Sequence, residues 1–469
     1  MSNIVRNAGL SQVSLIFACG TATFSDGYTN NVIGSANTLI TRIYGEKAVS
    51  QHSYNTTVSS MAFAGTVVGI ILFGYLSDKV GRKFGMMTAT CIIAIFSALS
   101  AVSIGAHHSL GGMLYMLSAC RFLLGIGVGA EYPCGAVAAA EQSEQPGIER
   151  NAQHRWFVLA TNTMTDWGTV AGAFVPLVLY WIFGPHNLHA VWRFSLGLGA
   201  IPALAVLVWR LRMEEPERYK EYSMRKCKIP YTLVIKRYWK NLAPICATWF
   251  IHNFIVYPFN IFSSTIINTV TGGSTSLSTV FGWNVVINLF YIPGTMGGAF
   301  IVDYIGPKRC QILGLLSQAV IGFIMSGLYV QLSHHIAAFA VVYGIFLSLG
   351  EIGPGNCSGL SASKTSPTAV RGQFYCIAAA VGKVGAFVGT WAFPAIISDF
   401  GSGTVSDTGP FWIGSGLAVL SAAITYFWIK PVTHDGLVLE DRLFREYLEE
   451  NGYDTSQMGI VGRQVKALP

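Results

Sequence analysis

Long apolar runs alternate with short polar connections over most of the chain. Apolar runs of about 20 residues are long enough to cross a bilayer as helices. The pattern predicts twelve such spans, at 10–36, 54–77, 84–104, 112–140, 153–183, 190–211, 240–268, 279–302, 310–330, 335–362, 370–398 and 409–430. These runs are too long, and alternate too little, for membrane strands. We therefore expect an all-α integral membrane protein.

One long polar stretch divides the predicted spans six and six. It covers 212–239, and we expect it to be a cytoplasmic linker between two six-helix bundles, at 1–211 and 240–430. Residues 431–469 should form a cytoplasmic tail. A short amphipathic helix is expected there, from about Glu440 to Glu450, followed by a disordered end.

Lysine and arginine are concentrated in the even-numbered connections, whereas the odd-numbered ones carry little beyond Arg42 and Lys47. Positive residues favour the cytoplasmic side of a membrane. Both termini are therefore expected to be cytoplasmic. The net charge of +7, from 30 basic and 23 acidic residues, mostly reflects this bias, so we expect no nucleic-acid partner.

Composition excludes a soluble protein. Hydrophobic residues make up 52% of the chain and charged residues only 11%, with mean hydropathy +0.48. Soluble domains use about one quarter charged residues, so this chain has too few to cover a water-facing surface. The nine cysteines lack the spacing of disulfide or metal sites. No catalytic nucleophile, metal cluster or phosphate-cradling loop is visible, so neither enzyme activity nor a cofactor is expected.

A charged turn joins two spans at 74–83 and recurs in weaker form at 298–309, about half the chain further on. Such a duplication is typical of transporters whose halves move against each other. Asp78 is expected to cap a helix N-terminus or to pair with an arginine. Arg82 and Lys83 should anchor in the inner headgroup layer. A loop that only sets topology is the alternative.

The second copy contains Asp303 and Arg309, but its basic pair is displaced by one residue. We expect both copies to take part in gating. The inner gate should be held more firmly on the Asp78 side.

Ionisable residues inside spans cost a few kcal/mol or more unless they face a cavity or a partner. They are Asp26, Arg121, Glu131, Asp166, Glu351 and Lys383, with His252 as a weaker member. Glu131 and Glu351 each lie beside a Gly/Pro cluster in the fourth span of a half. Desolvation disfavours their charged form, which suits a proton carrier. A neutral acid satisfied by hydrogen bonds is the alternative for both.

Lys383 lies far from either end of the eleventh span. A buried ammonium should be compensated by a carboxylate, such as Glu351, or by an anionic solute. Arg121 could equally be a structural partner of a neighbouring helix. His252 is more often a packing histidine than a proton shuttle.

The turn at 74–83 resembles the signature loop of the major facilitator superfamily. Arg121 through Pro133, Thr248 to Tyr257, and 371–386 resemble the fungal and plant phosphate:proton symporter family. The resemblance implies that the position of Glu131 handles the proton and that Lys383 is the family lysine. It also implies that the phosphate pocket is lined by Tyr132, Trp249 and Tyr257.

Several positions depart from the phosphate carriers. The family's seventh-span aspartate is Asn253 here, and its tenth-span asparagine falls on Gly355, beside Asn356. A pocket changed in this way has lost acceptors and gained volume. Ser25-Asp26-Gly27-Tyr28 and Gly129 to Pro133 are more similar to the fungal glycerophosphoinositol and glycerophosphocholine permease branch.

We therefore expect a multi-pass plasma-membrane importer that couples proton entry to uptake of an organophosphate anion, such as a glycerophosphodiester. Lys383 would attract the phosphodiester. The pocket would be completed by Tyr132, Tyr257 and Trp249, with Asn253 and Asn356 at the headgroup. The proton would be carried by Glu131, Asp26 and Glu351.

Alternatives stay open on the same scaffold. The solute could be inorganic phosphate, a carboxylate or a secondary metabolite, and transport could run outward. A nutrient receptor is disfavoured because no sizeable soluble signalling domain is visible. Asn55, in an Asn-x-Thr sequence, is a candidate glycosylation site. The partners expected are a small anionic solute, protons and the bilayer, with a monomeric protein.

Overall fold

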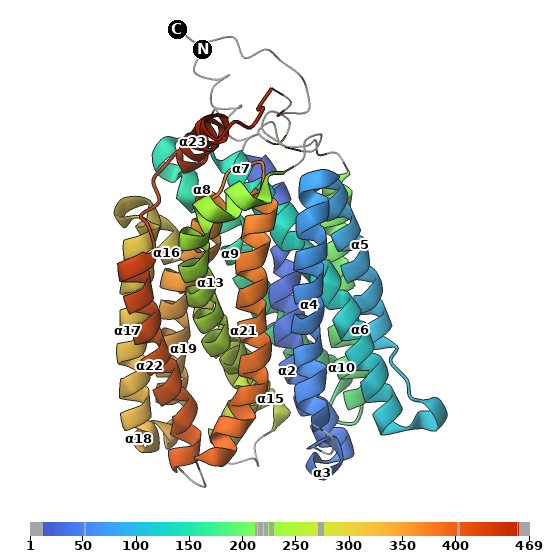
Figure 1. Cartoon of the computed structure of the whole chain (residues 1–469). Coiled ribbons are helices and arrows are strands. Elements are labelled where there is room, and N and C mark those ends of the chain that lie inside the picture. The colour runs from blue at the N-terminus through green and yellow to red at the C-terminus, as the bar shows by residue number, and fades with distance from the viewer. Residues whose placement is uncertain are drawn as a thin grey trace, which may run out of the picture.

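A computed structural model describes residues 13–50, 53–145, 147–211, 213, 219, 224, 229–270, 276–400, 404–456 and 458. Within these ranges the regular structure is entirely helical. Figure 1 shows the helices packed side by side as a bundle, with α23 (Gly436–Glu450) lying across one end. This end is called the α23 end below. The all-α expectation is confirmed.

The N-terminal half begins with a helix at 13–20 and ends with α11. Its elements are α2 (Thr23–Tyr44), α3 (Glu46–Ser50), α4 (Tyr54–Lys79), α5 (Arg82–Ala101), α6 (Leu110–Glu131), η3 (Tyr132–Ala136), α7 (Val137–Ser143), α8 (Gln153–Ala160), α9 (Asn162–Phe183), α10 (Leu188–Gly197) and α11 (Ala200–Arg210). The π-helical turn η3 contains Pro133 and joins α6 to α7 as one bent span.

The C-terminal half has a similar succession, including a second π-helical turn in its fourth span. Its elements are α13 (Tyr231–Ile261), α14 (Ser263–Val270), α15 (Leu277–Leu289), α16 (Tyr291–Ile305), α17 (Pro307–Gly327), α18 (Tyr329–Ser333), α19 (Ile336–Gly350), η5 (Glu351–Gly355), α20 (Asn356–Lys364), α21 (Arg371–Asp399) and α22 (Thr404–Trp428). Since α13 begins at Tyr231, the predicted linker at 212–239 extends too far. Residues 231–239 instead form the first turns of the seventh span, where Lys236 is exposed and Arg237 half-buried.

Eleven described helical segments are long and apolar enough to cross a membrane. The remaining predicted span is α2, which continues to Tyr44 rather than ending at 36. Its buried face carries polar residues such as Asp26, Asn30 and Asn37, so α2 is less apolar than the others. A helix surrounded by protein does not need an apolar surface. Together these segments account for the twelve expected spans.

Each half is held together by closely packed helix pairs. In the N-terminal half α2 packs on α9 and α4 on α6; in the C-terminal half α13 packs on α21 and α17 on α22. Glycine permits the closest approaches, because a Cβ atom at Gly65 would lie only 1.8 Å from the carbonyl oxygen of Phe122. The halves meet mainly where α4 lies against α21.

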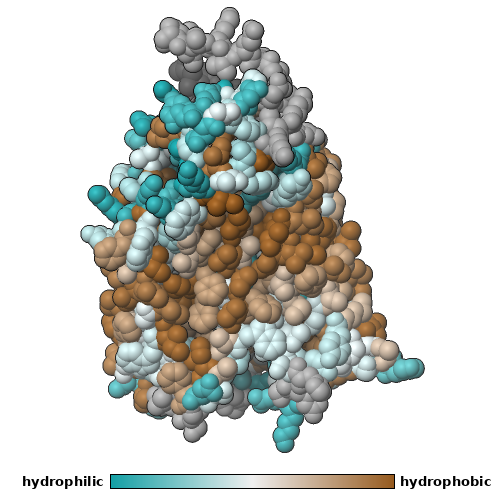
Figure 2. All heavy atoms as spheres, viewed as in Figure 1, coloured by the Kyte–Doolittle hydropathy of each residue, from teal (hydrophilic) through white to brown (hydrophobic). Residues whose placement is uncertain are grey.

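Side-chain polarity follows the axis of the bundle. Figure 2 shows hydrophobic side chains over the middle of the molecule and hydrophilic ones gathered at the α23 end. In α23 itself, Leu437, Phe444 and Leu448 are buried, while Arg442 and Glu446 are exposed. The expected amphipathic tail helix is therefore confirmed. The expected disordered end falls at 459–469, outside the described residues.

Candidate functional site

A cavity of about 100 Å³ lies between the two halves. Five of the predicted pocket residues line it: Tyr132, Trp249, Asn253, Tyr257 and Asn356. Glu351, predicted to carry a proton, lines it as well. Three of them recur every four residues along α13, so they lie on one face of that helix. The π-helical turns contribute at Tyr132 and Glu351.

Lys383 and Asp26 form a buried ion pair beside this cavity. The Lys383 Nζ atom lies 3.0 and 3.3 Å from the two carboxylate oxygens of Asp26. Nζ also donates to the Tyr257 hydroxyl at 2.5 Å, and the Tyr132 hydroxyl donates to Asp26 Oδ2 at 2.7 Å. The side chains of Lys383 and Asp26 are only 1% and 3% exposed. Two tyrosines of the cavity wall thus cover the pair.

The pairing of Lys383 differs from one sequence expectation. Glu351 was a suggested partner, but Asp26 on α2 occupies that role. Asp26 is further fixed by Asn30, whose Nδ2 donates to its Oδ1 at 2.6 Å. The place of Lys383 along its span does not show which carboxylate of another helix pairs with it.

Glu351 and Asp166 face the cavity from opposite halves. Glu351 Oε2 accepts from Asn162 Nδ2 at 2.9 Å, and Asn162 also donates to Asn356 Oδ1 at 2.8 Å. Asp166 Oδ2 is buried without a hydrogen bond in the structure described here. A Cβ atom at Gly355 would lie 2.0 Å from Glu351 Oε2. Glycine at this position therefore leaves space for the Glu351 carboxylate.

Glu131 lies away from the cavity wall, in contrast to its expected proton-carrying role. Arg210, at the end of α11, donates to its two carboxylate oxygens at 2.6 and 2.7 Å. Arg210 is fully buried and also donates to the backbone carbonyls of Cys19 and Met86. Such a two-pronged pair stabilises the charged carboxylate. Arg210 was not among the residues singled out from the sequence.

The first charged turn forms a buried ion-pair network at the α23 end. Asp78 is 2.6 Å from Arg82, which is 3.1 Å from Glu141. Glu141 in turn lies 3.2 Å from Arg371 in the other half. We call these four residues the inner network.

The inner network also closes the gap between α4 and α21. Asp78 Oδ2 accepts from the backbone N–H of Gln373 at 3.0 Å, in the first turn of α21. Asp78 therefore both pairs with an arginine and caps a helix, as expected. Arg82 is fully buried, so the prediction that it anchors in the headgroup layer is wrong. Lys83, nearer the surface, donates to the carbonyl oxygen of Leu211 at 3.2 Å.

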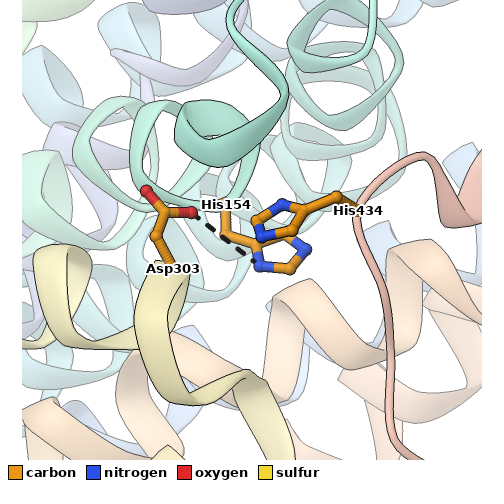
Figure 3. Close-up of side chains that lie close together, drawn as sticks. All are labelled: His154, Asp303 and His434. Atoms are coloured by element: carbon orange, nitrogen blue, oxygen red, sulfur yellow. Dashed lines mark ion pairs between the residues drawn. The ribbon is translucent and has the colours of Figure 1, made fainter.

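The second charged turn is held more weakly, as its displaced basic pair suggested. Asp303 accepts from the backbone N–H of Arg155 at 3.2 Å, and its nearest recorded ion-pair partner is His154 at 3.9 Å. Arg309 is exposed and makes no ion pair in the described part of the chain. Figure 3 shows the Asp303 carboxylate facing His154, with the ring of His434 stacked beside it at 4.2 Å between centroids.

His434 lies beyond the last span, in the segment that leads to α23. Partial burial lowers the pKa of its imidazole, and the nearby charges of Lys364 and Arg150 lower it further. Protonation of His434 is therefore less favourable than that of a free histidine. This cluster supplies stacking rather than a strong ion pair.

The tail helix α23 reaches both halves. Thr368 of the C-terminal half donates through its hydroxyl to Asp441 at 2.7 Å. Glu144 of the N-terminal half pairs with Lys364 at 2.7 Å and accepts from the backbone N–H of Leu437. Glu141, Glu144 and Asp441 were not predicted as functional residues. Glu141 and Glu144 follow directly on an apolar run, and Asp441 lies within the expected tail helix.

Contacts between the halves also lie on the far side of the cavity. Trp391 Nε1 of α21 donates to Ser60 Oγ of α4 at 3.0 Å. Asn31 Nδ2 of α2 donates to Asn288 Oδ1 of α15 at 2.8 Å. Along α21, Lys383 lies between Gln373 and Trp391. The cavity is thus bounded by contacts toward both ends of the bundle.

Three further residues singled out from the sequence lie in or near the helices around the cavity. His252 lines the cavity, and Arg121 donates to the backbone carbonyl of Thr29 at 2.7 Å. Asn55 lies half-buried in the first turn of α4, with Nδ2 3.5 Å from Thr41 Oγ1. Its glycosylation stays a prediction.

Replacing Glu141 by Gln should loosen the inner network. A buried pair that loses one charge is destabilised by about 3–5 kcal/mol, so the halves should separate more often at the α23 end. Cys376, buried against Gly74, is a natural reporter of that separation. In a background where Cys376 is the sole cysteine, its alkylation should accelerate about tenfold or more.

The matched control for this measurement is Glu149→Gln, because Glu149 is exposed and lies outside the inner network. Its alkylation rate should equal that of the parent. An unchanged rate in the Glu141 variant would show that the inner network does not hold the two halves together.

Two helical halves around a buried polar cavity, joined by ion pairs between them, define a membrane transporter. The chain belongs to the Major Facilitator Superfamily, whose family model matches residues 19–390. It is therefore a multi-pass membrane transporter, and the relatives below are transporters rather than enzymes.

Two fungal permeases are similar over most of the chain. A glycerophosphocholine permease of Candida albicans is 45% identical over 451 residues, covering 95% of this chain and 84% of that protein. A major glycerophosphoinositol permease of the same organism is 42% identical over 468 residues, covering 98% and 86%. The chain belongs to the same family as these permeases, which confirms the resemblance noted in the sequence.

The fold also matches a solved structure. The proton:xylose symporter XylE, bound to 6-bromo-6-deoxy-D-glucose, aligns with a TM-score of 0.74. The alignment covers 92% of this chain and 99% of that chain at 18% sequence identity. At this identity the likeness shows the fold alone.

Proposed function

We propose that this transporter imports glycerophosphodiester anions across the plasma membrane together with protons. The family of fungal permeases supports the solute class. The observation that carries the proposal is the Lys383–Asp26 pair beneath Tyr132 and Tyr257. In this pair, the ammonium that would bind the phosphodiester contacts the carboxylate that would carry the proton.

The contact suggests how the two solutes are coupled. Asp26 and an incoming phosphodiester compete for the same ammonium, because Lys383 is fully buried and meets its partners at one side of the cavity. Protonation of Asp26 would weaken its hold on Lys383. The ammonium would then need the anion as a new counter-charge. Proton binding and anion binding thereby favour each other.

The remaining wall residues shape the pocket. Once Asp26 is protonated, the hydroxyls of Tyr257 and Tyr132 can turn toward the phosphate together with Lys383 and donate hydrogen bonds to its oxygens. Asn253 carries no charge, which lessens the repulsion of an anion. Trp249 and Asn356 border the space left for the rest of the solute.

Gating would follow from contacts at both ends of the cavity. We assign the α23 end to the cytoplasm, in agreement with the distribution of basic residues. Opening to that side requires separation of the inner network. Opening to the outside requires separation of Trp391 from Ser60. A monomer contains all of these parts.

Two other carboxylates, Glu351 and Glu131, were also predicted to carry the proton. Glu351 faces the cavity, but Asp26 is the carboxylate paired with Lys383, so we assign the proton to Asp26. Glu131 is held by Arg210, so we assign it a structural role instead. If net positive charge enters with the solute, the membrane potential drives uptake by about 2.3 kcal/mol per charge per 100 mV.

The experiment is an uptake panel in a host that lacks glycerophosphodiester and phosphate transport. Labelled glycerophosphocholine and glycerophosphoinositol should accumulate, faster at pH 5 than at pH 7, and uncouplers should stop them. Excess unlabelled phosphate or small carboxylates should compete poorly. Preferential uptake of phosphate or carboxylate would refute the solute class, and net efflux would refute the direction.

A further inference from the structure

The cavity wall is acidic in the structure described here. Its described lining includes two carboxylates, Asp166 and Glu351, and no lysine or arginine. Asp166 is contributed by α9 and Glu351 by η5. Lys383 is excluded from the wall by Tyr257 and Tyr132, and its charge is already matched by Asp26. A wall of this kind is unusual for a site that receives only an anion.

Neither carboxylate is neutralised by the protein. Neither forms an ion pair within the described ranges, and one oxygen of Asp166 is buried without a hydrogen bond. Glu351 receives a single recorded side-chain hydrogen bond, from Asn162. Buried, unpaired carboxylates are costly unless a cation or a proton joins them. The wall is therefore prepared for a positive group.

Aromatic side chains lie around the same space. Trp249 and Tyr375 both line the cavity and meet edge to face, with ring centroids 5.5 Å apart and planes at 84°. Tyr291 lines it as well. Aromatic faces attract quaternary ammonium groups, which carry charge but offer no hydrogen-bond donor. A primary ammonium group, in contrast, has N–H donors that would form hydrogen bonds with the amide and hydroxyl oxygens nearby.

We propose that Asp166 and Glu351, together with Trp249 and Tyr375, bind the quaternary ammonium headgroup of a zwitterionic glycerophosphodiester. Lys383 binds the phosphodiester of the same molecule. This inference rests on the proposed function and adds the residues that select the headgroup. An inositol headgroup is neutral, so it lacks the charge attraction to the two carboxylates, and its hydroxyls can donate to an amide oxygen as well as to a carboxylate.

The absence of a side chain at Gly355 helps to fix the position of the Glu351 carboxylate. A Cβ atom there would lie 2.0 Å from Glu351 Oε2 and 3.3 Å from Asn162 Nδ2. Any side chain at 355 would displace the carboxylate and its hydrogen-bond donor together. Alanine at this position should therefore act like the loss of the Glu351 charge, without changing any ionisable residue.

The test compares uptake of labelled glycerophosphocholine and glycerophosphoinositol by Asp166→Asn, Glu351→Gln and Gly355→Ala variants. The KM for glycerophosphocholine should rise about tenfold or more, which corresponds to about 1.4 kcal/mol. The KM for glycerophosphoinositol should stay within about twofold, because its headgroup is uncharged. Asp399→Asn is the control, since Asp399 is an exposed acid at the end of α21.

Purified protein gives a second readout that does not need transport. Glycerophosphocholine should raise the melting temperature of the parent, and this shift should shrink selectively in the three variants. An equal loss for both solutes, with loss of pH dependence, would show that the carboxylates are proton sites and would overturn the proposal. Unchanged KM values would overturn it too. Failure of the parent to transport either solute would instead refute the proposed function.

Discussion

Replacing Lys383 by Gln is expected to lower glycerophosphodiester uptake at least about 100-fold, because the cation paired with Asp26 beside the cavity wall is removed. Loss of one partner from a buried charge pair costs about 2–5 kcal/mol. The anion would then enter a space whose remaining charges are negative. The measurement is initial uptake of labelled glycerophosphocholine, normalised to the amount of protein in the membrane.

The same substitution leaves Asp26 buried without its ion-pair partner, so folding needs its own control. The double variant Lys383→Gln with Asp26→Asn removes both charges and should accumulate to parental levels while remaining inactive. Near-parental uptake by either variant at normal protein levels would contradict the role assigned to Lys383.

Replacing Arg210 by Gln is expected to destabilise the whole N-terminal half. It leaves the Glu131 carboxylate buried and unpaired, at a cost of about 3–5 kcal/mol. The backbone carbonyls of Cys19 and Met86 also lose their donor. The amount of folded protein and its melting temperature in detergent should both fall clearly.

The matching double variant, Arg210→Gln with Glu131→Gln, separates structure from proton transport. It restores electrical neutrality, so stability should recover in large part. Uptake by the double variant should keep its dependence on external pH, because Asp26 is intact. Should that dependence vanish while the protein remains folded, Glu131 would be a proton carrier as its sequence context first suggested.

The fold could be predicted from sequence because membrane spans have a strong signal. A buried segment of about 20 apolar residues has few alternatives to a helix. The predicted helix bounds were inaccurate where a helix is surrounded by protein or carries basic residues. Thus α2 carries a polar inner surface around Asp26 and Asn30, and its end at Tyr44 was placed too early. The start of α13 at Tyr231 was missed because its first turns carry Lys236, Arg237 and Lys240.

The cavity was predicted in part. Trp249, Asn253 and Tyr257 share one helix face, and resemblance to known carriers singled them out. Pairings between distant helices could not be predicted in the same way. Burial cost shows that Lys383 and Glu131 each need a partner, yet it does not identify the partner. Asp26 and Arg210 became visible in these roles only once the helices were packed.

We propose that glycerophosphodiester and protons enter together through the Lys383–Asp26 site. The most direct test of this claim is proton flux, recorded with a pH electrode while glycerophosphocholine is added to a weakly buffered suspension of cells expressing the transporter. We predict alkalinisation of the medium that tracks uptake and disappears in the Asp26→Asn variant. Uptake of glycerophosphocholine without any pH change, and insensitive to uncouplers, would contradict the claim.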